Sequence, residues 1–275
     1  MMQTAILGML AETPVHPGSG RGLGVVDLPV AREAATDYPV VVGSSLKGAL
    51  KDKAERTETT KKDVAPHFGE PNHAGQLLVS DARLLLLPVR SLTSSYRWAT
   101  CPHLLERFGR DLKRAGQRYG RGVVPEVALG TVHTHGNGHL FLEERQFEVK
   151  AEPGDALIGA LKRLLVHDET AKRLADHIAI LHDDDFSWFA RYGLSIQARN
   201  VLDDNKKSKN LWHEETLPAD TVMYGLVAGR SDEALGILEH LFPETDPYLQ
   251  VGGNETVGQG WFAVRVIRDS AGSQQ

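Results

Sequence analysis

The segment HPGSGRGLGVVDLPVARE, residues 16–33, gathers groups that could do acid–base or phosphate chemistry on one irregular stretch. It places His16 and Asp27 among four glycines. A loop carboxylate can act as a general base or bind a metal ion, and a histidine can donate a proton or orient a phosphate. The structural alternatives are that Asp27 organises a turn and that backbone groups hold His16. Because glycine lets backbone approach a ligand closely, the segment is a candidate site.

Signatures of other chemistries are missing. GSGRGLG lacks the G-x-G-x-x-G spacing, GSSLKG lacks that of a P-loop, and there is no G-x-S-x-G nucleophile elbow. HTHGNGH carries His133, His135 and His139 without cysteines or a suitably spaced carboxylate, which favours a polar loop over a metal site. HDDDF favours a helix cap, with Asp185 near the helix N-terminus. A small-molecule phosphotransferase is therefore disfavoured.

The distribution of charge is uneven. The net charge of −5 argues against a general nucleic-acid binder, but residues 90–121 contain eight Lys/Arg against two acidic residues, and residues 44–62 contain six against three. Such asymmetry suits a polyanion-binding face, although solvated helix faces would give the same pattern. The lone Cys101 excludes an intrachain disulfide. With no leader-like start and no apolar run of roughly 18 residues, we expect a cytoplasmic protein without a membrane role.

The elements that must position these groups alternate irregularly, which favours an α+β fold over a doubly wound parallel sheet. Residues 39–56 predict a strand, a loop and a helix, with Ser44 or Ser45 as the N-cap. The clearest helix lies between Pro102 and Gly116, where apolar residues form one stripe and arginines the other face.

Residues 194–217 predict two strands around a polar tip at 203–210. The tip is too polar to fold back on a core, and its lysines suit the phosphates of a passing strand. The second strand ends in LWHEETLP, which places Glu214 beside Glu215. Neighbours on an extended segment point to opposite faces, so we expect the two carboxylates to differ in role.

Several phrases taken in order resemble a known family. They are HPGSGRGLGVVDLPVARE…YPVVVGSSLKGALKDK, HFGE…GQLLVSDARLLLLPVRSL…YRWATCPHLLERF, LWHEETLP and VGGNETVGQGW. In this order and spacing they are similar to the backbone subunits of type III-B (Cmr) CRISPR effector complexes, which belong to the repeat-associated mysterious protein (RAMP) superfamily. The similarity runs from residue 4 to about residue 267.

The resemblance implies one RAMP domain over residues 1–275, built on an RRM-like ferredoxin core (βαββαβ) with inserted elements. One insertion is a β-hairpin thumb at approximately 194–217. A central antiparallel four-stranded sheet should then contain residues 3–10 and 261–267, both of which show suitable apolar alternation.

The resemblance also implies a function. Copies of the subunit stack into a filament along the CRISPR guide RNA, together with other Cmr subunits, and the thumbs interrupt the guide–target duplex. Each copy cuts the paired target RNA as an endoribonuclease, with a divalent metal ion (Mg or Mn), and leaves a cyclic phosphate. Alternatives are a purely structural guide-binding subunit and a stand-alone ribonuclease that processes precursor RNA.

The residues matched to catalysis are Asp27, His16, Glu214 and Glu215, and Asp27 is also the expected metal ligand. Thr216 stands where the family is expected to have an aromatic residue, which argues against a tyrosine-assisted step. Lys47 begins a helix whose free N–H groups already favour phosphate. The full set of RNA-binding candidates is Gly18, Ser19, Gly20, Arg21, Ser44, Ser45, Lys47, Lys51, Arg90, Arg97, Lys206, Lys207, Gly252, Gly253, Gly258 and Gly260.

Overall fold

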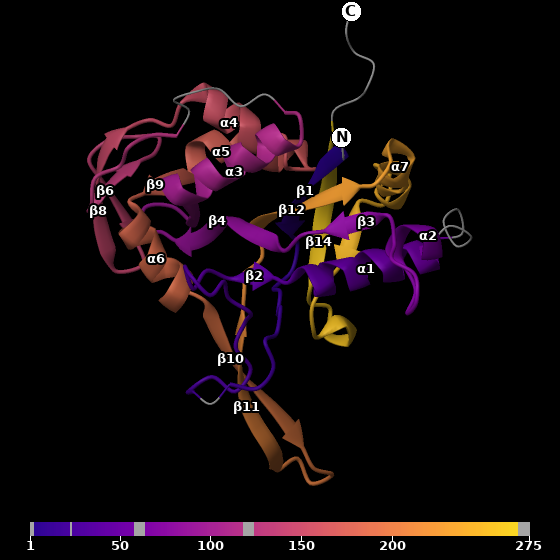
Figure 1. Cartoon of the computed structure of the whole chain (residues 1–275). Helices are drawn as coiled ribbons and strands as arrows, with labels where there is room; N and C mark the ends of the chain where they lie inside the picture. The colour runs from indigo at the N-terminus through magenta and orange to yellow at the C-terminus, as the bar shows by residue number, and fades with distance from the viewer. Residues whose placement is uncertain (1–2, 23, 58–63, 118–123, 269–275) are drawn as a thin grey trace, which may run out of the picture.

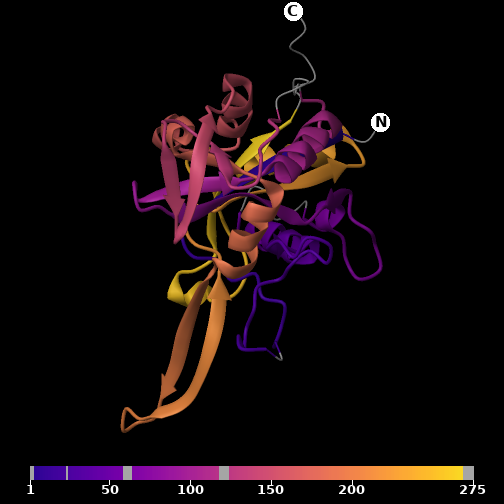
Figure 2. The same ribbon diagram turned by 90° about the vertical axis from the view of Figure 1, so that its left-hand side faces the viewer.

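A large mixed sheet runs through the molecule, and a separate two-stranded hairpin projects from it (Figures 1 and 2). The computed structural model describes residues 3–22, 24–57, 64–117 and 124–268. The helices are α1 (Gly43–Arg56), α2 (Val64–Phe68), α3 (Pro102–Arg114), α4 (Asp155–Lys162), α5 (Asp168–His177), α6 (Asp183–Tyr192), α7 (Asp232–Leu241) and the 3₁₀ turn η1 (Glu255–Val257). The strands are β1 (Gln3–Ala11), β2 (Val40–Val41), β3 (Leu77–Val79), β4 (Ala82–Arg90), β5 (Tyr96–Thr100), β6 (Thr131–His133), β7 (His139–Leu142), β8 (Arg145–Ala151), β9 (Ile178–Leu181), β10 (Ser195–Leu202), β11 (Ser208–Thr216), β12 (Val222–Gly229), β13 (Tyr248–Gln250) and β14 (Trp261–Ile267).

The first and last strands lie side by side, as expected. β1 pairs antiparallel with β14 on one side and with β12 on the other, and β12 is buried along its whole length. The sheet is larger than the expected four strands. It has 12 strands in the order β13-β14-β1-β12-β4-β5-β9-β6-β8-β7, with β2 and β3 paired to β4 and β12. The sheet grows because strands from residues 96–181 continue it beyond β4.

Helix α1 forms where its apolar periodicity predicts, but its N-terminus differs. Leu46 and Leu50 are fully buried, whereas Ser44 and Ser45 are exposed and lie inside the first turn. The N-cap is Val42, whose side chain cannot cap. The N–H of Gly43 instead donates to Asp81 Oδ1 at 2.6 Å, so a carboxylate from the start of β4 satisfies the helix end. The serine N-cap prediction is therefore wrong, because a tertiary partner supplies the acceptor.

Helix α3 confirms the predicted amphipathic pattern, with its apolar stripe buried and most of its arginines at the surface. Two charged side chains of α3 form ion pairs with residues from other parts of the chain. Arg107 pairs with Glu33 at 2.8 Å, and the buried Asp111 binds Arg83 at 2.6 Å. Asp111 also accepts the hydroxyl of Tyr224 at 2.9 Å, and burial together with this carboxylate raises the pKa of the Tyr224 phenol. Arg107 is thus neutralised by Glu33, whereas Arg83, from outside residues 90–121, neutralises the acidic Asp111.

Strands β10 and β11 form the projecting hairpin, coloured orange in Figures 1 and 2. They pair antiparallel from Ser195 opposite Thr216 to Leu202 opposite Ser208. The tip is therefore residues 203–207, shorter than the expected 203–210, because the second strand begins at Ser208. The Asp203 carboxylate accepts the N–H groups of Asn205 and Lys207, both at 2.9 Å, and so fixes the turn. In the part of the chain that the structure describes, no helix is long and apolar enough to cross a membrane.

Candidate functional site

The irregular segment of residues 12–42 lies against the root of the hairpin (Figure 1). Leu28 forms a parallel bridge with Glu214: its N–H donates to the His213 carbonyl, and its carbonyl accepts the N–H of Glu215, both at 3.0 Å. Val15 pairs with Leu217 in the same region. These backbone bonds bring Asp27 next to the glutamate pair, although nearly 190 residues separate them.

Asp27 is held in place and yet open to solvent, with 54% of its side chain exposed. Its Oδ2 accepts the backbone N–H of His213 at 2.7 Å, and the His213 Nδ1 lies 3.6 Å from the same oxygen. The Asp27 carbonyl accepts the N–H of Gly22 at 2.9 Å, which closes the glycine-rich loop. The sequence did not point to His213 as a functional residue. Its only indication there is its position next to Glu214.

Glu215 is a clamp. It is buried, its Oε1 lies 2.7 Å from Arg32 Nη2, and its Oε2 accepts the N–H of Val30 at 3.0 Å. Arg32 also donates to the carbonyls of Asp37 and Ala190, both at 2.8 Å. Both carboxylate oxygens of Glu215 are therefore occupied by partners within the protein. Glu215 therefore fastens the segment to the hairpin root.

Glu214 points to a different element, as the alternation of side chains along a strand requires. It is 2% exposed and accepts a hydrogen bond from the Asn254 side-chain amide. Arg199 Nη2 on the facing strand lies 3.8 Å from its Oε1. Asn254 has the left-handed φ of 66° and also donates to Gln259 Oε1 at 2.9 Å. Glu214 thus ties the hairpin root to the C-terminal glycine loop.

His16 lies where the 12–42 segment, the hairpin root and the C-terminal glycine loop meet, and it is 8% exposed. Its Nδ1 lies 2.8 Å from the Glu215 carbonyl, so Nδ1 carries the proton and donates. The His16 carbonyl accepts the N–H of Gly253 at 3.0 Å. A Cβ at Gly252 would lie 2.6 Å from that carbonyl, and one at Gly18 would lie 2.8 Å from His16 Nε2. The glycines of both loops are therefore required for close packing around His16.

The RNA-binding candidates are spread over several surfaces. Lys206 and Lys207 are exposed at the hairpin tip, and Arg21 is exposed in the segment near Asp27. Ser19 donates its hydroxyl to the Pro29 carbonyl at 3.3 Å, and Gly20, Gly258 and Gly260 adopt positive φ.

Two arginine candidates already have protein partners. Arg90 on β4 pairs with Glu143 at 2.8 Å. Arg97 on β5 donates to the Asp176 carbonyl, and burial lowers the pKa of its guanidinium. The structure does not bring these two arginines to the cluster around Asp27.

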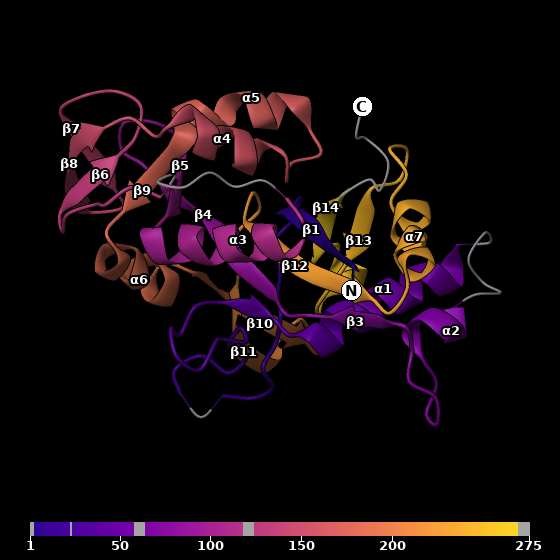
Figure 3. The same ribbon diagram turned by 45° about the horizontal axis from the view of Figure 1, so that its top comes forward.

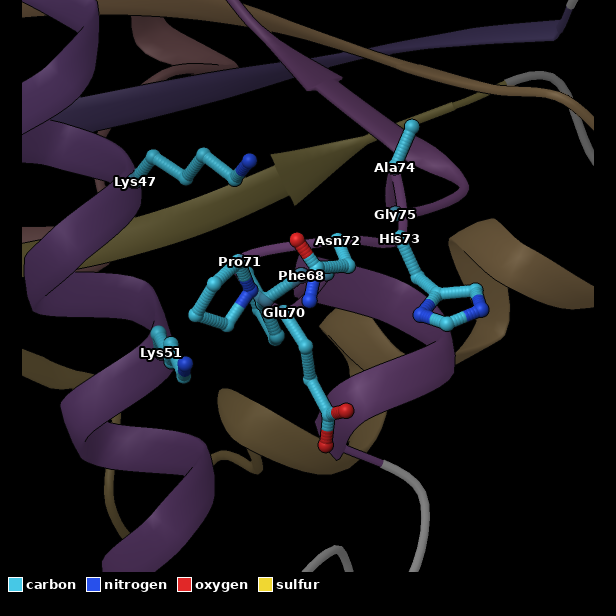
Figure 4. A pocket seen from close by; sticks show the side chains of 10 residues that line it. Lys47, Lys51, Phe68, Glu70, Pro71, Asn72, His73, Ala74 and Gly75 are labelled. Atoms are coloured by element: carbon cyan, nitrogen blue, oxygen red, sulfur yellow. The ribbon is translucent and has the colours of Figure 1, made fainter.

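Lys47 and Lys51 line a cavity of about 550 Å³ between α1 and residues 68–75 (Figure 4). In Figure 4 Lys47 extends from α1 toward that loop, and Lys51 lies one turn further along the same helix. Ser44 and Ser45 precede them in the exposed first turn of the helix.

The segments HTHGNGH and HDDDF make contacts within the protein. Within the described ranges no group of three or more His, Cys, Asp or Glu side chains is arranged to hold a metal ion. His135 pairs with Glu152 at 3.1 Å, and burial lowers the pKa of His133. His182 caps α6 by accepting the N–H of Asp184 at 3.1 Å. The HDDDF motif thus caps the helix as expected, and Asp185 lies in the first turn of α6, where its buried carboxylate binds Arg145 at 3.1 Å.

Comparison with known proteins identifies relatives along almost the whole chain. A family model described as RAMPs, RAMP superfamily, matches residues 9–263. The chain is 36% identical over 282 residues to the "CRISPR system Cmr endoribonuclease Cmr4" of Pyrococcus furiosus, covering 96% of this chain and 95% of that protein. The structure resembles the crystal structure of oligomeric Cmr4 from Pyrococcus furiosus, with a TM-score of 0.79 and 29% identity over 98% of this chain and 100% of that one. It also shares its fold with a chain of the type III-B Cmr-beta complex bound to cognate target RNA, with a TM-score of 0.78 and 20% identity over 96% of each chain.

Proposed function

The chain belongs to the RAMP superfamily, and from this premise we propose that it is a guide-RNA-binding backbone subunit of a type III-B CRISPR effector complex that cuts the paired target RNA. Its relative of 36% identity is named an endoribonuclease, and a similar crystal structure is described as oligomeric. The observation that carries the catalytic part is the exposed Asp27 carboxylate, oriented by the His213 N–H at the root of the hairpin. Its partners are guide RNA, target RNA, further copies of itself and other Cmr subunits.

The strand order supports the assignment of a ferredoxin-like core. The elements β1, α1, β4, β12, α7 and β14 follow one another in a βαββαβ sequence with insertions between them. Their strands lie in the order β14-β1-β12-β4, and every adjacent pair is antiparallel. We assign the whole chain to one RAMP domain and the hairpin, inserted between α6 and β12, to the thumb.

Cleavage through the target's own 2′-hydroxyl fits the geometry around Asp27. In this proposal the Asp27 carboxylate accepts the 2′-hydroxyl proton, the O2′–P bond forms, and the P–O5′ bond breaks to leave a cyclic phosphate and a 5′-hydroxyl that takes up a proton. The His213 N–H keeps one carboxylate oxygen fixed, which preserves the orientation of the other. His16, Glu214 and Glu215 act by holding the 12–42 segment, the hairpin root and the C-terminal glycine loop together.

A divalent cation fits this site only in part. Asp27 is the one member of the proposed catalytic set whose carboxylate is largely exposed, since Glu214 and Glu215 are buried and bound elsewhere. Mg²⁺ is commonly bound by one or two carboxylates and substrate phosphates rather than by a protein cage. We propose Asp27 as the protein ligand, with RNA phosphate oxygens as the others. When bound, the ion would neutralise charge on the scissile phosphate.

Lys47→Ala is expected to weaken guide binding by roughly 1 kcal/mol and to make the salt dependence of the affinity shallower by about one unit of slope. The reason is the loss of one phosphate contact, which positions RNA without reading its bases. The measurement is guide affinity of the full chain at several salt concentrations. Lys113→Ala, an exposed lysine on α3, is the matched control. Equal affinity and slope for Lys47→Ala and the unmodified chain would remove Lys47 from the site.

Replacing residues 203–207 with Asn-Gly is expected to shorten the hairpin without unfolding the protein, because the tip makes turn contacts only within itself and Asn-Gly suits a two-residue turn. The target should still be cut, but at positions with disturbed spacing. Mapping of cleavage products on a labelled target tests this. A double variant, Lys206→Gln with Lys207→Gln, removes the positive charge of the tip but keeps the full length of the hairpin. It therefore distinguishes the effect of charge from the effect of hairpin length. Unchanged cut positions in the shortened variant would contradict the thumb assignment.

A further inference from the structure

The cavity between α1 and residues 68–75 has features that the cleavage site does not use. It measures about 550 Å³, is open to solvent, and has two lysines on its α1 wall (Figure 4). We propose that this cavity binds the sugar–phosphate backbone of RNA, with phosphate at Lys47 and Lys51 and the ribose 2′-hydroxyl at Asn72 and His73. The inference rests on the proposed RNA-binding function and adds a second wall that recognises ribose.

The two lysines on the α1 wall of the cavity can bind an anion. Among the described residues Lys47 makes no ion pair, and Lys51 meets only Glu55 at 3.8 Å across a pair of partly exposed side chains. An exposed pair of this kind contributes little to stability and leaves the lysine free to exchange partners. Glu70 is the acidic side chain of the cavity, and its carboxylate points away from Lys47 in Figure 4. The two ammonium groups therefore dominate the α1 wall.

The facing wall is a turn closed by backbone hydrogen bonds. Glu70 and His73 exchange two backbone hydrogen bonds, of 2.9 and 3.0 Å. Gly69, before the turn, has a φ of +84°, and a Cβ at Gly75, after it, would lie 2.4 Å from the His67 carbonyl. Both positions therefore require glycine for the two ends of the turn to come together. The turn is exposed from residue 70 to 74 and buries no apolar side chain that would explain its order. A preordered polar turn beside two lysines fits ligand binding better than core packing.

The chemistry of the turn favours RNA over a simple anion. The Asn72 amide and the His73 ring offer both donors and acceptors, and the ribose 2′-hydroxyl is itself a donor and an acceptor. In Figure 4 both side chains come from the turn that faces α1, with the His73 ring on the side of the turn away from the two lysines. Figures 1 and 3 show this turn projecting on the same side of the sheet as the 12–42 segment, so one RNA strand can pass along both. The cavity thus joins phosphate contacts to a group that distinguishes RNA from DNA.

The test compares single-stranded RNA and DNA of one sequence binding to the full chain, measured by fluorescence anisotropy. Asn72→Ala and His73→Ala should each lower RNA affinity roughly threefold to tenfold, the range for a lost neutral hydrogen bond. DNA affinity and the salt slope should stay unchanged, whereas Lys47→Ala should weaken both ligands. Asn137→Ala and His135→Ala, in the exposed β6–β7 turn, are the matched controls.

RNA affinity that survives both Asn72→Ala and His73→Ala overturns the inference, as does an equal loss for RNA and DNA. Either result leaves the proposed function standing if the unmodified chain binds RNA, whereas an unmodified chain that binds no RNA refutes the proposed function itself. A photo-crosslinking amino acid at position 72 of the assembled complex then identifies the strand. Crosslinks to labelled guide or to labelled target support the cavity as an RNA site and name its source, and crosslinks to neither refute it.

Discussion

We expect Asp27→Asn to lower the rate of target cleavage by about 10² or more while assembly and target affinity stay nearly unchanged. The substitution keeps the shape of the side chain and the oxygen that accepts the His213 N–H, but it removes the charge. A positioned acid–base group typically contributes 10² to 10⁴ in rate. Target binding is spared because pairing with the guide supplies it. The measurement is single-turnover cleavage of labelled target by the assembled complex at saturating metal.

The control for Asp27 is Asp184→Asn, an exposed carboxylate in the first turn of α6 with 83% of its side chain accessible. It should cut at the normal rate, which excludes a general effect of removing one surface charge. A complex carrying Asp27→Asn that also cuts at the normal rate would refute the catalytic assignment. The purely structural guide-binding subunit would then be the correct function.

Glu215→Ala is expected to destabilise the chain by about 3 kcal/mol, the scale for removing one partner of a buried ion pair. The Arg32 and Glu215 side chains are 16% and 10% exposed. The loss would leave the Val30 N–H without its acceptor and the guanidinium without a carboxylate, although Arg32 would keep its bonds to backbone carbonyls. Urea unfolding of the isolated chain measures this change. Cleavage should fall as well, since the clamp holds the segment that carries Asp27.

A double-mutant cycle distinguishes the clamp from simple loss of packing. Arg32→Met should destabilise the chain strongly, and the double variant Arg32→Met, Glu215→Ala should lose less free energy of unfolding than the sum of the two single changes. Arg90→Met is the matched control, because its pair with Glu143 is largely exposed and should be worth less than about 1 kcal/mol. Strict additivity of Arg32→Met and Glu215→Ala would show that the two side chains do not act as a pair.

Much of the local structure follows from patterns within a few residues. Apolar spacing predicted α1 and α3, and alternating segments with a polar middle predicted β10 and β11. These signals are reliable because a helix or a hairpin satisfies its backbone within its own segment. The family resemblance, which depends on the order of whole phrases, pointed to RNA-guided cleavage and to Asp27.

The tertiary structure alone decided how the candidate side chains are used. Sequence alternation predicts that Glu214 and Glu215 point apart, but only the fold shows that one meets Asn254 and the other Arg32. The bond from His213 to Asp27 spans 186 residues, and the acceptor that caps α1 comes from Asp81. Such contacts produce no periodic pattern in the sequence, because a long-range hydrogen bond depends on where two distant segments of the backbone meet. The composition of the chain and its local periodicity therefore determine its elements and its candidate groups, and chain packing determines which of those groups remain open to solvent.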